Sequence, residues 1–388
     1  MTTLEILKPL LADLIGFPTV STDSNLELIA YAAQYLEDLG ARVDVNRDAT
    51  GTKANMFATL GPESDGGIIL SGHSDVVPVD GQDWTTDPFR MTEIDGAFHG
   101  RGAGDMKGYI AACLAMAPEF AAVELARPLH FALTYDEEIG CFGARALIGE
   151  LRQAGLKPAL AIIGEPTEMR IIEGHKGCYE YTTEFIGLEG HGSLPDRGVN
   201  AVEYAVRYAT KLLDLRQAVK LKAPASSRFD PPHTTLQIGR MFGGIARNVI
   251  AGQCAVDWEM RPVRPGDAAF VKAEIGAYVD EVLRPAMQAV HADADIITRV
   301  IGEVEGLEPV AQSEARRIVA ELTGDGSSDV VAFGTEAGIF QRSDISAVVC
   351  GPGSIAQAHK PNEFVTADQL QACLDMLAGL RHKLARAA

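Results

Sequence analysis

The stretch GIILSGHSDVVP, residues 67–78, sets the expectation for the fold. Its first part, residues 67–71, is a short apolar run typical of a strand that is buried on both faces. The polar residues His73 and Asp75 follow directly after this run. In open parallel sheets, ligands bind just beyond the carboxyl ends of the strands. The stretch therefore predicts a buried strand that delivers an imidazole and a carboxylate to a functional edge.

The same pattern occurs three more times along the chain. Apolar runs at residues 129–134, 160–164 and 347–350 are each followed by acidic or imidazole side chains. In chain order these side chains are Asp136, Glu137, Glu138, Glu165 and His359. Four strand ends that carry such groups predict one common site, because chance acidic loops would be spread over both ends of a sheet.

Helical patterns separate these apolar runs. They span residues 26–39, 107–119 and 143–154, and a further candidate strand spans residues 55–60. Alternation of short strands with helices is typical of an α/β fold. We therefore expect a catalytic domain built on a mostly parallel sheet with helices on both faces.

The pattern changes after Gly177. Residues 179–301 predict a strand, a helix, two strands, a helix and a strand, in that order. This β-α-β-β-α-β order is that of a ferredoxin-like fold. We therefore predict a catalytic domain in two parts, residues 1–176 and 303–388, with a smaller domain inserted at residues 177–302.

The composition excludes several classes of function. The chain has 34 basic and 53 acidic residues, which give a formal net charge of −19. This balance argues against binding to nucleic acid and to anionic membranes, since both need basic patches. No apolar stretch approaches the roughly 18 residues of a membrane span, and no signal peptide is evident. The six cysteines never form a C-x-x-C pair, so we expect reduced thiols in a cytoplasmic protein.

The residue types at the predicted edge indicate a catalytic metal site. Imidazole nitrogen and carboxylate oxygen, without thiolate, suit zinc, cobalt or manganese. Two ions about 3.5–4 Å apart need a carboxylate shared between them. Asp105, in the segment GRGAGDMKG at residues 100–108, is the candidate bridge, because the glycines allow an unusual backbone turn. We expect two divalent metal ions, zinc in the first place and cobalt as the alternative.

The spacing of the residues suggests further roles. His73 and Asp75 are two residues apart, so in an extended backbone they face the same side. The Asp75 carboxylate can then accept the second ring N–H of the histidine. Glu137 and Glu138 are adjacent and point to different sides. One of them can bind metal while the other acts as the general base for a water molecule.

Four motifs resemble those of the M20 metallopeptidase family. They are SGHSDVVP at residues 71–78, GRGAGDMKG at 100–108, DEE at 136–138 and GEPT at 164–167. The resemblance runs over almost the whole chain, including the predicted insert. It implies a metal-dependent amidohydrolase in which the inserted domain is a lid.

The resemblance also implies a role for each residue of the predicted site. The implied ligands of one ion are His73, Asp105 and Glu165, and those of the other are Asp105, Glu138 and His359. Asp75 would orient His73, and Glu137 would be the base that activates the water molecule.

The inserted domain carries three further candidates by resemblance. The segment GHGSLP at residues 190–195 is similar to the family segment whose histidine, here His191, polarises the scissile carbonyl, often from the partner subunit. Asn248 and Arg261 match positions that contact substrate in the family. In chemical terms, His191 and Asn248 could donate hydrogen bonds to a developing oxyanion, and the Arg261 guanidinium could clamp a carboxylate.

Two positions of the inserted domain depart from the family pattern. Gly190 stands where alanine is usual, and Ala251 stands where proline often follows the asparagine motif. The resemblance further implies a homodimer formed through the lid domain.

The segment GPGSIAQAHKPNEF, residues 351–364, narrows the substrate class. It resembles the branch of the family that deacetylates N-acetyl amino acids, and residues 173–177 and 334–338 agree with that branch. The expected partner is a small N-acyl amino acid. One alternative is a desuccinylase, another deacylase or a dipeptidase of the same build. The other is a metal-binding protein without catalysis, against which the presence of both Glu137 and a full ligand set argues.

Two other enzyme classes are excluded by their missing motifs. The segment at residues 100–108 is no dinucleotide fingerprint, since Asp105 stands where G-x-G-x-x-G requires glycine, and no P-loop is present. Hydrolysis by an activated serine is also disfavoured, because the chain has no G-x-S-x-G elbow.

Overall fold

The computed structural model describes residues 2–386, so residues 1, 387 and 388 of the predicted catalytic domain lie outside it. The chain folds as two compact units. The first comprises the residues up to Gly174, then Pro309–Val330 and the residues from Thr335 onward, and the second comprises His175–Glu308 and Val331–Gly334.

The first unit is built on a mixed, mostly parallel sheet of eight strands in the order β1-β2-β6-β3-β7-β16-β8-β15. The strand bounds are β1 (Arg42–Arg47), β2 (Ala54–Leu60), β3 (Ile68–His73), β6 (Leu129–Thr134), β7 (Leu160–Ile163), β8 (Ile172–His175), β15 (Asp329–Val331) and β16 (Ser346–Val349). The four central strands β6, β3, β7 and β16 are parallel to one another. Their carboxyl ends therefore lie along one edge, as the four apolar runs predict.

Strands outside this parallel centre run the other way. β2 pairs antiparallel with both β1 and β6, and β8 pairs antiparallel with β16. The connection between β1 and β2 is short, and a short connection can join only antiparallel neighbours. A second, three-stranded sheet is made of β17 (Phe364–Thr366), β5 (Ala97–His99) and β4 (Thr92–Ile94).

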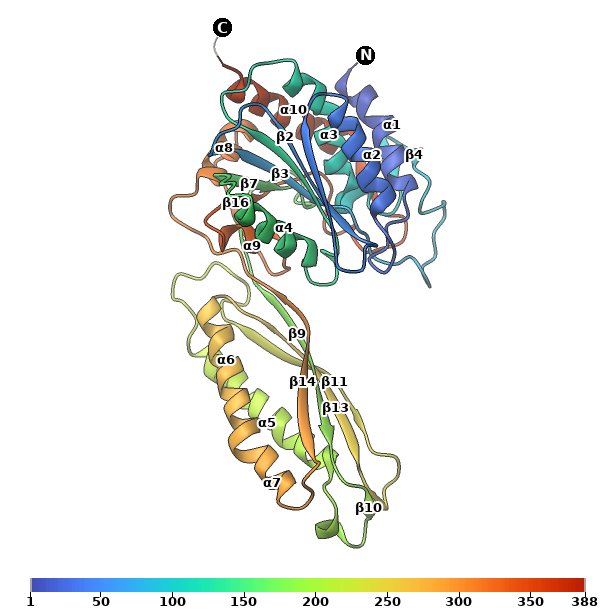
Figure 1. The fold of residues 1–388 in the computed structure, drawn as a ribbon, viewed down its shortest axis with the longest axis vertical. Helices are drawn as coiled ribbons and strands as arrows, with labels where there is room; N and C mark the ends of the chain where they lie inside the picture. The colour runs from blue at the N-terminus through green and yellow to red at the C-terminus, as the bar shows by residue number, and fades with distance from the viewer. Residues whose placement is uncertain (1, 387–388) are drawn as a thin grey trace. The chain divides into compact units, whose positions relative to one another are not determined.

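Helices cover both faces of the main sheet, as predicted. Figure 1 shows α1 (Thr3–Gly16), α2 (Leu26–Glu37), α3 (Gly108–Ala121) and α10 (Ala367–Leu384) on one side, and α4 (Phe142–Gln153) and α9 (Ala337–Gln341) on the other. Helix α8 (Glu314–Thr323) packs against α10.

Strand β3 shows why the central strands are apolar along their whole length. Side chains alternate between the two faces of a strand. Ile68 and Leu70 pack into the main core with helices α1, α3 and α10, whereas Ile69 lies on the opposite face. Both faces are covered by helices, so no residue of β3 is exposed to solvent. The burial confirms the interpretation of the apolar run as a doubly covered strand.

The second unit is a four-stranded antiparallel sheet in the order β11-β13-β9-β14 with helices on one face (Figure 1). Its main elements are β9 (Cys178–Ile186), α5 (Ala201–Lys220), β11 (Thr235–Gly243), β13 (Gln253–Arg261), α6 (Pro265–Tyr278), α7 (Arg284–Gln288) and β14 (Asp295–Val304). Short strands β10 (Gly190–His191) and β12 (Val249–Ile250) form a separate ladder. The core of the second unit includes the stacked rings of Tyr181 and Trp258, and Tyr208 packs edge-on against Trp258.

The long helix predicted in this unit is interrupted. The helical path passes from α6 through a wider π-type turn at Val279–Leu283 into α7. Pro285 lies just after that turn. A proline has no N–H to donate and its ring crowds the preceding turn, which accounts for the local change of hydrogen bonding.

Within residues 2–386 no helix combines the length and apolarity that crossing a bilayer requires.

Candidate active site

The parallel centre of the main sheet brings the predicted residues to one edge. His73 is the last residue of β3, Glu137 and Glu138 follow β6, and Glu165 follows β7. His359 lies in the loop after β16. Because β6, β3, β7 and β16 are parallel neighbours, these loops emerge side by side.

Asp105 lies between the two histidines. Its Oδ1 is 2.9 Å from Nε2 of His73, and its Oδ2 is 3.4 Å from Nε2 of His359. The two oxygens of one carboxylate thus face two different imidazoles. This is the geometry that a carboxylate shared between two metal ions requires.

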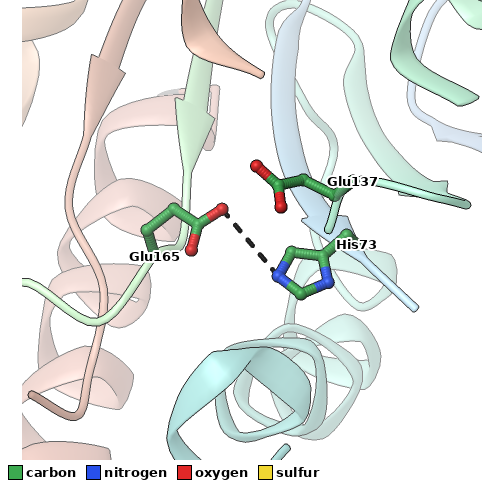
Figure 2. Close-up of side chains that lie close together, drawn as sticks. All are labelled: His73, Glu137 and Glu165. Carbon is green, nitrogen blue, oxygen red and sulfur yellow. Dashed lines mark ion pairs between the residues drawn. The ribbon is translucent and has the colours of Figure 1, made fainter. Parts of the chain in front are cut away.

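A second carboxylate accompanies each imidazole. Glu165 Oε1 lies 3.9 Å from His73 Nε2, and Figure 2 shows Glu137 and Glu165 both near the His73 ring. On the other side of Asp105, Glu138 Oε2 lies 3.0 Å from His359 Nε2. The structure therefore places one imidazole and one further carboxylate on each side of Asp105.

The candidate ligand atoms lie at nearly the spacing that ligands of one ion have. Atoms bound to one zinc ion at about 2.0–2.2 Å lie within roughly 4.4 Å of one another. One atom from each of His73, Glu137 and Glu165 lies within 4.8 Å of the others, and the same holds for His73, Asp105 and Glu138. The first grouping holds two implied ligands of one ion, His73 and Glu165, together with Glu137, the implied base; the second holds the shared Asp105 with one implied ligand from each side, His73 and Glu138.

The turn that carries Asp105 is irregular. It spans Ala103–Lys107 ahead of α3, and Asp105 itself has a non-helical backbone with φ −122° and ψ 90°. Gly102 has a φ of +81°, and a Cβ there would approach Val76 to 2.8 Å. The Asp105–Met106 peptide bond is cis. The unusual turn expected from the glycines of this segment is thus present.

Asp75 connects the histidine to the proposed base. Nδ1 of His73 lies 2.9 Å from the backbone carbonyl of Asp75 and 3.6 Å from its carboxylate. The shorter contact means that the carbonyl, rather than the carboxylate, sets the ring orientation. The Asp75 carboxylate instead accepts hydrogen bonds from Ser21 Oγ at 2.7 Å and from the backbone N–H of Glu137 at 3.1 Å.

The carboxyl groups of the site shift one another's protonation. Burial raises the pKa of Glu137 to about 8. Burial also raises the pKa of Glu165 well above its usual range, and the charge of Asp105 adds to this. Hydrogen bonds to Asp105 and Glu138 raise the pKa of His359 to about 10. Burial is the main cause of the raised pKa of the two glutamates and the neighbouring carboxylates add to it, whereas the carboxylates are the main cause for His359.

An unsatisfied buried oxygen and the types of donor atoms also fit a site for divalent cations. Glu165 Oε1 is buried and has no hydrogen-bond partner, although buried polar atoms are normally satisfied. It points toward His73 Nε2, where an ion of the first set would lie. A mixed set of nitrogen and oxygen donors, without sulfur, suits zinc or cobalt in a catalytic centre.

His359 differs from the other members of the site in its exposure. Its side chain is 53% exposed, against 1% for His73. Its backbone φ is +61°, a conformation that histidine adopts rarely. The loop that carries it is therefore held in place by particular contacts rather than by regular structure.

Two candidates of the second unit lie together. The ladder of β10 and β12 pairs His191 with Val249, and the N–H of Gly192 donates to the carbonyl of Asn248. Both His191 and Asn248 are exposed. Nδ1 of His191 accepts from the backbone N–H of Ser193 at 3.2 Å, so a neutral ring carries its proton on Nε2. That Nε2–H is the donor a carbonyl-polarising histidine needs.

Arg261 lies elsewhere in the same unit. It ends β13, whereas β12 precedes the start of that strand at Gln253. Eight residues of strand at about 3.3 Å each separate the two ends. The guanidinium is paired with Glu259 at 2.9 Å, so a substrate carboxylate would have to compete with this partner. The structure therefore does not bring Arg261 to His191 within the second unit.

Three residues near the site received no role from sequence reasoning. Glu363, Arg101 and Gln82 form a hydrogen-bonded group beside the turn of Asp105 and the loop of His359. Glu363 and Arg101 stand inside segments quoted above for other reasons. Each of these two segments contains a charged residue, Arg101 in one and Glu363 in the other. The sequence alone does not show that these two charges are buried.

Comparison with known proteins places the chain among peptidases and deacetylases. Residues 69–383 match peptidase family M20/M25/M40. The chain is 37% identical over 384 residues to the acetylornithine deacetylase of Myxococcus xanthus, with 97% of each chain covered. It is 32% identical over 379 residues to that of Pasteurella multocida, with 95% of each covered.

A solved structure agrees with the fold. The M20 family metallo-carboxypeptidase of Sulfolobus solfataricus superposes with a TM-score of 0.74 at 16% identity, covering 97% of this chain and 98% of the other. At this identity the likeness concerns the fold alone. It confirms the predicted α/β fold with a mixed, mostly parallel main sheet.

Proposed function

The chain belongs to peptidase family M20/M25/M40, and on this premise we propose that it hydrolyses N2-acetyl-L-ornithine to L-ornithine and acetate. It is a metal-dependent amidohydrolase. The observation that carries the substrate is the likeness, over nearly the whole chain, to two acetylornithine deacetylases. The ornithine released would serve arginine biosynthesis.

Two divalent metal ions, zinc or alternatively cobalt, complete the proposed site. We assign His73, Asp105 and Glu165 to one ion and Asp105, Glu138 and His359 to the other. The contacts of the two Asp105 oxygens with different imidazoles support this assignment. When bound, the ions would polarise the amide carbonyl and make a water molecule acidic enough to attack at neutral pH.

Glu137 is the proposed proton carrier. Its carboxylate accepts the proton from the attacking water, and the water oxygen bonds to the acetyl carbon. The C–N bond then breaks as Glu137 returns the proton to the leaving nitrogen. Burial raises the pKa of Glu137, so its carboxylate holds a proton more strongly than an exposed glutamate does, which suits a group that must accept a proton and then return it. The backbone N–H of Glu137 donates to the Asp75 carboxylate, and the Asp75 carbonyl contacts the His73 ring. Asp75 therefore fixes the position of Glu137 relative to His73.

The second unit is proposed to act as the lid and to form the contact of a homodimer. The proposed lid domain, residues 177–302, lies within this unit, whose main segment is His175–Glu308. In this proposal Nε2–H of His191 and the amide of Asn248 donate to the oxyanion, from the same chain or from a partner copy. Arg261 is proposed to bind the substrate carboxylate in exchange for Glu259.

The proposed substrate can be tested with a panel of amides. Metal-depleted protein is loaded with zinc or cobalt, and amine release is measured from acetylornithine, other acetyl-amino acids, succinyl-diaminopimelate and dipeptides. We expect the highest kcat/KM for acetylornithine, because an enzyme discriminates through contacts that only the right substrate makes.

Other results of the panel would redirect the proposal. A preference for succinyl-diaminopimelate or for a dipeptide would contradict the acetylornithine assignment and retain the amidohydrolase. If metal-loaded protein hydrolyses none of these amides, the proposal that it is a catalyst of amide hydrolysis is contradicted as well.

His191→Ala tests the contribution of the second unit. We expect kcat to fall by about 10²–10³-fold, the usual cost of losing one donor to an oxyanion. Metal content should be unchanged, because His191 belongs to the other unit. His291→Ala, a histidine of the same unit outside the β10–β12 ladder, is the matched control and should keep its activity. Equal kcat in both variants would remove His191 from the mechanism.

A further inference from the structure

The carboxylate of Glu363 lies inside the turn that carries Asp105. It is 1% exposed. Its Oε1 accepts backbone N–H groups from Gly104 at 2.9 Å and from Asp105 itself at 3.0 Å. Its Oε2 accepts the backbone N–H of Gly102 at 3.1 Å and Nη1 of Arg101 at 2.7 Å. One side chain thus accepts three backbone N–H groups of an irregular turn, those of Gly102, Gly104 and Asp105.

We propose that Glu363 is a positioning residue that fixes Asp105 between the two metal ions, an inference that rests on the function proposed above. The turn has non-helical torsions at Asp105 and Met106. The backbone N–H groups of Gly104 and Asp105 donate to the Glu363 carboxylate, which therefore serves as their acceptor in this irregular stretch. A charged carboxylate that accepts hydrogen bonds on both oxygens restrains the backbone groups that donate to it.

The same group extends to the other end of the site. Arg101 Nη2 donates to Gln82 Oε1 at 2.6 Å, and Gln82 Nε2 donates to the carbonyl of His359 at 3.0 Å. Arg101 Nη1 also lies 3.3 Å from the carbonyl of Lys360. The turn of Asp105 and the loop of His359 therefore share one hydrogen-bonded network.

This network explains how an exposed loop can hold a ligand. His359 has a left-handed backbone and a half-exposed ring, and no helix or strand fixes it. Its carbonyl is tied through Gln82 to Arg101 and so to Glu363, four residues further along the chain. Asp105 and His359 are set relative to one another through Glu363 and Arg101.

Glu363 itself is not a metal ligand. Both of its oxygens are occupied by N–H donors, two on each oxygen. It acts on the metal through the ligand it holds. Partners of this kind typically change metal affinity by about 10–100-fold when they are altered.

Glu363→Gln tests the proposal with the size of the side chain unchanged. The amide keeps one acceptor oxygen and turns an NH₂ group toward the other two N–H donors. Two of the four hydrogen bonds to this side chain are therefore lost. Zinc is titrated by calorimetry into metal-depleted full-length protein, and the thermal midpoint is measured alongside. We expect zinc affinity to fall about 10–100-fold, and at both sites, because Asp105 serves both.

Asp267→Asn is the matched control. Asp267 is also buried, accepts from Thr234 Oγ1 at 2.6 Å and pairs with Arg264, but it belongs to the second unit. This variant should lower the thermal midpoint and leave zinc affinity unchanged. If Glu363→Gln also loses stability but binds zinc as tightly as the wild type, Glu363 is only structural and the proposal is wrong.

A milder variant decides the matter if Glu363→Gln does not fold. Gln82→Glu keeps the acceptor for Arg101 and for Trp84 but removes the donor to the His359 carbonyl. We expect a loss of zinc affinity of several-fold, concentrated in the site that includes His359. Unchanged affinity at both sites would overturn the proposal.

The zinc titration distinguishes a failure of the proposed function from a failure of the positioning role of Glu363. Wild-type protein that binds no zinc contradicts the proposed function and the positioning role together. Wild-type protein that binds two ions, with both variants matching it in affinity, contradicts only the role of Glu363.

Discussion

Glu137→Gln should lower kcat about 10²–10⁴-fold while the protein still binds its metal ions. The expected loss is that of a general base that also returns the proton to the leaving group. Glutamine has nearly the same shape, and the backbone N–H at this position can still donate to the Asp75 carboxylate. The amide side chain, however, cannot accept a proton at neutral pH. Steady-state hydrolysis of acetylornithine and the zinc content per chain are the two measurements.

A distant glutamate provides the control for this variant. Glu314 lies on α8 in the same unit and pairs with Arg127 at 3.1 Å near the surface. Glu314→Gln should retain wild-type turnover. If Glu137→Gln keeps most of its kcat with metal bound, the base must be sought elsewhere. If it loses zinc as well, Glu137 is a ligand rather than the base.

Asp105→Asn should have the largest effect on metal binding. An amide can offer one oxygen but not two, and it brings no negative charge between two cations. We expect the affinity for at least one ion to fall by more than about 100-fold, beyond what the loss of a ligand's partner causes. Turnover should fall with it. Calorimetric titration of zinc and metal analysis of the purified variant give the stoichiometry.

His359→Ala separates a shared ligand from an ordinary one. His359 contacts Asp105 and Glu138 but belongs to only one of the two proposed sets. This variant should keep one tightly bound ion at His73 and Glu165, whereas Asp105→Asn should disturb both. Equal loss in the two variants would argue against a bridging Asp105.

The centre of the fold was open to prediction because its strands are buried on both faces. The run at residues 67–71 has no polar interruption, and β3 lies between two parallel neighbours under helices on each side. The edge strands gave weaker signals. β1 has the sequence RVDVNR and is almost entirely exposed, so it lacks the apolar pattern on which strand prediction depends.

The site was predictable only as far as strand ends could locate it. His73 and Glu165 lie at or directly after their strands, and their meeting follows from the parallel order. His359 lies ten residues after β16 ends at Val349, and no periodicity places a loop of that length. Its position depends on Gln82, which is distant in sequence.

The contacts of Asp75 and Arg261 show a second limit. Spacing placed Asp75 on the side of His73, but whether its carbonyl or its carboxylate meets the ring depends on Ser21 and on the N–H of Glu137. The family resemblance implies that Arg261 contacts substrate, and the structure pairs its guanidinium with Glu259. Such competition between partners is settled by three-dimensional packing.

The central claim is that one carboxylate, Asp105, bridges two metal ions. It is tested most directly by a crystal structure of the zinc-loaded protein with anomalous differences measured at the zinc edge. We expect two peaks about 3.5–4 Å apart, one beside His73 and Glu165 and the other beside Glu138 and His359, with Asp105 between them. A single peak at full zinc loading, or two peaks that do not share Asp105, would contradict it.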